Sequence, residues 1–410
     1  MREMRRIGLS NVHAEGWQGG EAWRRISAGA EITAPERRAL HVASMGWTGS
    51  TTKDGVEGEV VVVERYKLAE EMSRNAGKWK GKILLLTASG LTRNFFRVVV
   101  ETAEFARVAE RVGALAIVAV DSPGTLGTTV THIDPLDFSG KYFAIPMAAI
   151  AFEDRVELER QVALGPVRVK LKLRNRLSGG ALHSAELRSA NVVGEILGAV
   201  HPGEIVVVGA HLDSWDLGEG ALDDGFGVAT VLQAAADLVR SGKRPGLTIR
   251  FVLFTGEEQG IAGSRAYVRR HAAELGKHYG ALICDQANGP IVGLQTNGRA
   301  DVGRGAGLEV SDSTYFFSDA LAFTLAGVPG IDAHQKSPEF AAVRHSEGDV
   351  FSLAEASVLE SNGAAVARVA MTLANAAGPL PARRTVDEIR EFFTRNGALE
   401  FLTGVGLWPY

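Results

Sequence analysis

The chain has 410 residues, of which 46% are hydrophobic, so it can bury a large core, and its length favours two domains. Its formal net charge of −4 excludes a general electrostatic attraction to nucleic acid. The longest apolar runs have the length of strands, and none approaches the length of a transmembrane helix. The single cysteine, Cys284, excludes an intrachain disulfide.

The N-terminal residues lack the apolar core of a signal peptide. Residues 1–7 have the composition of a helix that Gly8 would end, and residues 11–14 predict a first strand. We expect residues 15–38 to form a loop with short pieces of structure. The sequence leaves open whether the first helix is complete or is the end of a longer helix.

Residues 42–165 differ from the rest of the chain, because short apolar segments are separated by long connections. They predict strands at 41–46, 58–64, 82–86, 116–120 and 143–149, and a helix at 98–111. We interpret this block as a β-rich domain with its own core, inserted between residues 1–41 and 166–410 of the other domain. His132 and Asp134 lie close together in the block, where a solvated turn is the favoured interpretation.

From residue 167 onwards, expected strands alternate with expected helices. The strands are expected at 167–173, which alternates like an edge strand, and at 189–198, 204–210, 247–254, 280–284 and 328–332. The helices are expected at 228–240, 264–275, 318–326 and 357–376. This order predicts an α/β fold whose mostly parallel, twisted sheet has helices on both faces. Residues 385–410 predict a further helix and an apolar tail, for which packing onto this domain is favoured over a dimer contact or a lid.

Side chains that can bind metal ions gather where the expected strands end. His211, Glu258 and Asp285 follow strands closely, and Asp223 and His345 lie in loops after strands. In open parallel sheets, binding sites form outside the carboxyl ends of the strands. Histidine nitrogen together with carboxylate oxygen suits zinc, whereas oxygen alone would favour magnesium or calcium.

Two histidines and three carboxylates are too many ligands for one tetrahedral zinc ion with an open position. They fit two zinc ions if one carboxylate bridges the pair. Such a pair would hold a hydroxide between the ions and polarise a scissile carbonyl group.

Two further carboxylates have expected supporting roles. Neighbours on an extended chain face opposite sides, so Glu257 can face the substrate while Glu258 binds metal, and Glu257 can then move the proton that hydrolysis requires. Asp213 lies two residues after His211 on the same side of the strand, where its carboxylate could orient the imidazole ring.

The strings AHLDSWD, GALDDGFG, FTGEEQGIAGS, CD at Asp285 and RHSEGD at His345 resemble those of the cocatalytic zinc exopeptidases. Among these, the sequence is most similar to the carboxypeptidase Q-like branch, in which HLDSWD is distinctive. The match extends over residues 211–349 in order and spacing. The β-rich block at 42–165 resembles the protease-associated insert of that branch.

The resemblance implies an aminopeptidase-like zinc exopeptidase fold with two zinc ions per chain. It implies that His211 and Asp285 bind one zinc, that Glu258 and His345 bind the other, and that Asp223 bridges them. Glu257 becomes the general base and Asp213 the supporting carboxylate. Tyr315 is a candidate donor to the oxyanion, and Ser318 and Asp319 are candidates to line the substrate pocket.

We therefore expect a metallo-exopeptidase that hydrolyses dipeptides or short peptides. One alternative is a receptor-like binding protein on a peptidase scaffold, although such proteins lose ligands or the base and this chain keeps them. Another is a glutaminyl cyclotransferase, which uses a single zinc ion. Relatives carry an export signal and further helices before the first strand, so the resemblance favours missing upstream residues. If these are missing, it suggests a secreted or periplasmic protein, and the sequence as given leaves the localisation open. The sequence does not indicate whether a free amine or a free carboxylate is recognised.

Overall fold

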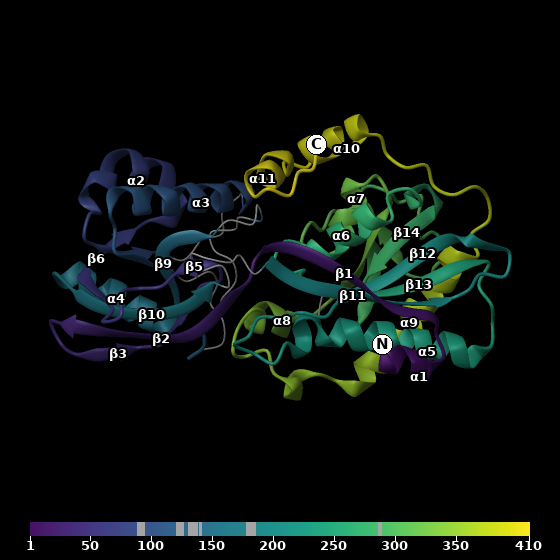
Figure 1. Cartoon of the computed structure of the whole chain (residues 1–410), viewed down its shortest axis with the longest axis horizontal. Helices are drawn as coiled ribbons and strands as arrows, with labels where there is room; N and C mark the ends of the chain where they lie inside the picture. The colour runs from purple at the N-terminus through teal and green to yellow at the C-terminus, as the bar shows by residue number, and fades with distance from the viewer. Residues whose placement is uncertain (88–94, 120–126, 130–137, 139–141, 178–185, 286–288) are drawn as a thin grey trace.

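The computed structural model describes two units that lie side by side along the longest axis of the molecule (Figure 1). The described residues are 1–87, 95–119, 127–129, 138, 142–177, 186–285 and 289–410. His132 and Asp134 lie outside these residues. In the described part of the chain, no helix is both long enough and apolar enough to cross a membrane.

The first unit is built on a sheet of eight strands among the described residues. In spatial order the strands are β1 (Ser10–Glu21), β11 (Glu186–Ile196), β13 (Leu247–Phe254), β12 (His201–His211), β14 (His278–Ile283), β17 (Gly330–Gln335), β15 (Ile291–Gln295) and β16 (Glu309–Ser311). The four central strands, β13, β12, β14 and β17, run parallel. Antiparallel pairs flank them, with β1 and β11 on one side and β15 on the other.

Helices cover both faces of this first sheet, as the alternation of elements predicted (Figure 1). One face carries α1 (Arg2–Ile7), α5 (Phe226–Ser241) and α9 (Ala356–Ala374), and the other carries α6 (Ala262–Arg270) and α7 (Ala320–Leu325). Val206 and Val208 pack in the first of these cores, whereas Ile205 and Val207 pack in the second. Because β12 is buried on both sides, its sequence is a continuous apolar run.

The second unit is built on a second sheet, formed by strands that lie in sequence between β1 and β11. In spatial order they are β3 (Arg38–Leu40), β2 (Trp23–Ala34), β10 (Arg168–Leu177), β6 (Val56–Val63), β7 (Ile83–Leu86), β8 (Ala116–Ala119), β9 (Phe143–Ile150) and β4 (Val42–Ser44), with β5 (Thr48–Gly49) paired to β9. Helices α2 (Leu68–Asn75) and α3 (Phe95–Val112) cover one face, and α4 (Phe152–Leu164) covers the other.

Two local expectations from the sequence are wrong. Residues 15–38 are mostly strand rather than loop, because β1 pairs with β11 and β2 pairs with β10. The strand expected at 167–173 is not an edge strand, because β10 lies between β2 and β6. As a consequence, the second sheet extends beyond residues 42–165 at both ends.

The C-terminal residues 385–410 join the two units. Helices α10 (Val386–Arg395) and α11 (Leu399–Gly404) lie above and between them (Figure 1). Phe392 and Phe393 share one apolar core with Leu321 of α7 in the first unit and with Val99 of α3 in the second. Burial of such large side chains in one cluster stabilises the arrangement of the two units.

Candidate metal centre

The predicted ligands meet at the carboxyl edge of the parallel strands. His211 is the last residue of β12, Glu258 follows the end of β13, and Asp285 follows the end of β14. Asp223 lies in the turn before α5, and His345 follows α8 (Pro338–Val343). All five side chains are well buried, with His211 only 1% exposed.

The five side chains form two groups that could each hold a metal ion. In the first group, His211 Nε2 lies 3.2 Å from Asp223 Oδ1 and 3.5 Å from Asp285 Oδ1. The ligand atoms of this group all lie within 4.8 Å of one another. This is the arrangement of donors that a single ion would require.

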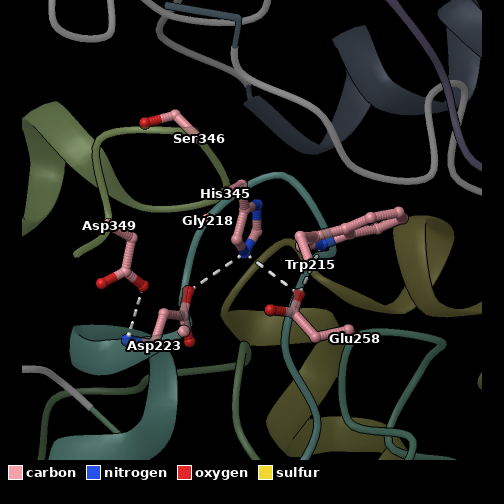
Figure 2. Close-up of a pocket in the computed structure, with 8 residues that line it drawn as sticks. Trp215, Gly218, Asp223, Glu258, His345, Ser346 and Asp349 are labelled. Atoms are coloured by element: carbon pink, nitrogen blue, oxygen red, sulfur yellow. Dashed lines mark hydrogen bonds and ion pairs between the residues drawn. The ribbon is translucent and has the colours of Figure 1, made fainter. Parts of the chain in front are cut away.

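The second group uses the other oxygen of the same aspartate. His345 Nε2 lies 3.2 Å from Asp223 Oδ2 and 3.1 Å from Glu258 Oε2, and Figure 2 shows both contacts. Asp223 thus presents one oxygen to each group. Opposing the effect of burial, the two histidines hold the pKa of Asp223 well below its usual value, so it stays ionised.

An observation on Glu258 tests whether a cation fits the centre. Its Oε1 is buried and has no hydrogen-bond partner among the described residues. A buried carboxylate oxygen without a partner is costly, and a metal ion would satisfy it. The donor set of imidazole nitrogen and carboxylate oxygen suits zinc. The residues present therefore fit a zinc centre.

Asp213 organises the turn that carries the two glutamates. Its Oδ1 accepts hydrogen bonds from the backbone N–H groups of Gly256, at 2.7 Å, and Glu257, at 3.2 Å, and its Oδ2 accepts one from Glu258 at 3.3 Å. Its carboxylate stands 3.7 Å from His211 Nδ1, whereas its backbone carbonyl oxygen lies 2.9 Å from that nitrogen. A proton on Nδ1 would leave Nε2 of His211 free to bind a cation.

Three neighbouring side chains hold the ligand loops in place. Asp224 accepts hydrogen bonds from the N–H groups of Gly227 and His211. Asp349 accepts hydrogen bonds from the backbone of Leu222 and Asp223.

Trp215 donates its indole N–H to Glu258 Oε2 at 2.8 Å (Figure 2). Trp215 and Asp349 belong to the strings HLDSWD and RHSEGD, so the signal was present in the sequence. Gly218 brings the two loops together, because a Cβ atom there would lie 2.5 Å from the backbone oxygen of Ser346.

Glu257 is half-buried beside the two groups. Burial raises the pKa of its carboxyl group well above the usual value, and the negative charges of Asp285 and Glu258 act in the same direction. Burial and the charge of Asp285 also raise the pKa of the Tyr315 hydroxyl. By contrast, Ser318 and Asp319 are fully buried and face no open surface.

The second unit reaches the ligand loops with aromatic side chains. Trp47 contacts Trp215 edge-on, with ring centroids 6.4 Å apart, and Trp23 stacks on Trp47 at 5.9 Å. Trp47 has a φ of 54°, a conformation that is uncommon for a bulky side chain and marks a constrained position. Arg25 of the second unit also pairs with Asp216 of the same ligand loop.

Comparison with known proteins identifies relatives of the chain. The family model described as Peptidase family M28 matches residues 191–290. Carboxypeptidase Q of Mus musculus is 30% identical over 396 residues, which cover 93% of this chain and 80% of the mouse protein. Carboxypeptidase Q of Xenopus laevis is 30% identical over 342 residues, which cover 81% of this chain and 70% of the frog protein.

Solved structures show the same architecture. A peptidase M28 precursor from Shewanella amazonensis has a TM-score of 0.81 and 28% identity, covering 94% of this chain and 88% of its own. BSAP, a zinc aminopeptidase from Bacillus subtilis, has a TM-score of 0.67 and 21% identity, covering 90% of this chain and 86% of its own. The second likeness concerns the fold alone.

Proposed function

Since the chain belongs to peptidase family M28 and is a zinc-dependent metallo-exopeptidase, we propose that it holds two zinc ions and hydrolyses dipeptides or short peptides. The observation that carries this proposal is the pair of ligand groups that share Asp223. His211 and Asp285 would complete one zinc site, and Glu258 and His345 the other. When bound, zinc lowers the pKa of water and polarises a carbonyl oxygen.

Glu257 is the residue that we assign to proton transfer. It lies next to Glu258 beside both ligand groups, where a carboxylate can take a proton from a bound water molecule and return it to a leaving group. We infer that it takes the proton of the attacking water and passes it to the leaving amine. Asp213 positions this glutamate by accepting its backbone N–H group.

We also propose that the second unit is a protease-associated insert. The chain leaves the first sheet after β1 and returns to it at β11, and β2 to β10 form the second sheet. On this basis the insert spans residues 23–177 rather than 42–165. Its apolar cores are separate from those of the first sheet, as expected of an inserted domain.

The variant Glu257→Ala tests the mechanism. We expect it to keep its zinc and to lose at least about 10²-fold in rate, the low end for acid–base catalysis. Zinc content by mass spectrometry and kcat on a dipeptide panel give the two readouts. Full activity in this variant would remove Glu257 from the mechanism. A measured content near one zinc per chain would favour the cyclotransferase alternative instead.

A further inference from the structure

In the described part of the chain, one arginine lies against the ligand groups. Arg344 Nε lies 3.8 Å from Asp223 Oδ2, and a terminal nitrogen, Nη2, lies 3.1 Å from His345 Nε2. Among the described residues, it is the only lysine or arginine within 4.0 Å of a carboxylate in the two groups. The positively charged guanidinium group of Arg344 therefore lies at the candidate metal centre rather than at its edge.

Contacts among the described residues leave part of the Arg344 guanidinium group without a hydrogen-bond acceptor. Its Nε is buried without a hydrogen-bond partner in the described part of the chain, while 41% of the Arg344 side chain is exposed. The ring of Phe340 lies 5.6 Å away and supports one face of the guanidinium. An arginine held in this way can turn its remaining donors towards a molecule that arrives from solvent.

The present contacts of Arg344 are with atoms that would bind a cation. If Asp223 Oδ2 and His345 Nε2 hold zinc, both are engaged, and the guanidinium must satisfy its donors elsewhere. A peptide offers two charged ends, an ammonium group that Arg344 repels and a carboxylate that it attracts. The guanidinium fork matches a carboxylate with two parallel hydrogen bonds.

We propose that Arg344 binds the free α-carboxylate of the peptide substrate. This inference rests on the proposed function, and it names the end of the peptide that is recognised. Because the guanidinium lies within 4 Å of ligand atoms, the carboxylate it binds belongs to the residue directly after the scissile bond. The enzyme then removes single C-terminal residues or cleaves dipeptides, and Arg344 determines that specificity.

The test compares two substrates that differ at one group. A dipeptide with free termini and the same dipeptide as its C-terminal amide are given to the zinc-loaded full chain and to Arg344→Gln. The unaltered protein should cleave the free acid roughly 10- to 100-fold more efficiently in kcat/KM, the size of one charge-assisted hydrogen bond. Arg344→Gln should bring this ratio close to one while its zinc content and its rate on the amide remain. Arg344→Lys, which keeps the charge but not the fork, should restore part of the ratio.

A binding measurement makes the test independent of turnover. Calorimetry with a free amino acid and with its amide should show tighter binding of the acid to the zinc-loaded protein, and Arg344→Gln should abolish the difference. Arg304→Gln is the matched control, because Arg304 is exposed and donates to the backbone oxygen of Ala300 away from the centre. It should leave both preferences unchanged.

Two results would overturn the inference. The acid-to-amide ratio could be unchanged in Arg344→Gln, including the case in which both substrates slow equally and Arg344 is part of the chemistry, or zinc could be lost. If the unaltered protein cleaves neither peptide, the proposed function fails. The amino-acid binding measurement then decides the role of Arg344 by itself.

Discussion

The two units of the molecule are built alike but carry different chemistry. Each has a row of parallel strands with helices on both faces, β13, β12, β14 and β17 in the first unit and β6 to β9 in the second. Within the described residues, both groups of ligand atoms belong to the first unit. The carboxyl edge of a parallel sheet thus offers a place for a site, and the residues that follow the strands decide whether a site exists.

The second unit contacts the loops that carry the candidate ligands. Trp47 packs on Trp215, which donates to Glu258, and Arg25 pairs with Asp216. His41 lies 2.9 Å from Glu347, two residues after His345. One unit therefore supplies the candidate ligands, while both units contact the loops that carry them. Four predictions test this division.

The largest effect is expected from Asp223→Ala, because Asp223 presents one oxygen to each ligand group. Zinc content should fall for both ions, and kcat/KM should fall by more than the roughly 10- to 100-fold that loss of a mere supporting partner costs. Asp154→Ala is the matched change in the second unit, where Asp154 accepts from Arg38 and from the His41 backbone. That control should keep its zinc. Two zinc ions retained by Asp223→Ala would contradict the shared role.

Zinc affinity should depend on pH through a histidine of the first unit. Although burial opposes it, Glu258 raises the pKa of His345 to about 9 in the metal-free protein. Zinc must then displace a proton, so affinity falls as pH drops below about 9, by about tenfold per pH unit for each proton. Titration against a chromophoric chelator between about pH 6 and about pH 8 measures this slope. An affinity that is flat over this range would show that the histidine is already deprotonated.

The variant Trp215→Phe should show how much the hydrogen bond that supports the candidate ligand Glu258 contributes, without changing a ligand itself. The change keeps an aromatic ring but removes the indole N–H that reaches Glu258 Oε2. Loss of such a partner typically costs 10- to 100-fold in metal affinity or activity, and we expect about that effect here. Trp79→Phe is the control in the second unit, because the Trp79 indole nitrogen has no partner among the described residues. Equal effects of the two variants would refute the role of the Trp215 hydrogen bond.

The smallest effect is expected from Trp47→Ala, which acts on Glu258 through Trp215. We expect a loss in kcat/KM of less than about tenfold, since the contact is one step removed from the ligand. Trp47→Phe should restore most of it by keeping the ring contact. Steady-state kinetics and thermal unfolding of both variants give the comparison. If Trp47→Ala lowers the thermal unfolding temperature but leaves kcat/KM unchanged, the second unit contributes to stability and not to the activity of the centre.

Much of the centre could be predicted from sequence because three of the five candidate ligands, His211, Glu258 and Asp285, follow strand ends. The strand expected at 247–254 has those same bounds in the structure, and Glu257 and Glu258 follow it. The strand expected at 11–14 lies within β1, but the rest of β1 and all of β2 could not be predicted, because they mix glycine, charged and aromatic residues without a clear alternation. They are strands because β11 and β10 pair with them, and such pairing is a property of tertiary context.

By itself the sequence determined the order of the elements, the α/β class and the five candidate ligands, because strand-end positions and ligand chemistry are local properties of the chain. Tertiary structure alone decided that Asp223 faces both histidines, that Trp47 reaches Trp215 across the two units, and that Arg344 turns towards the ligands. These contacts join residues far apart in the chain or depend on the path of a loop. They arise from packing the two units together, which no local pattern records.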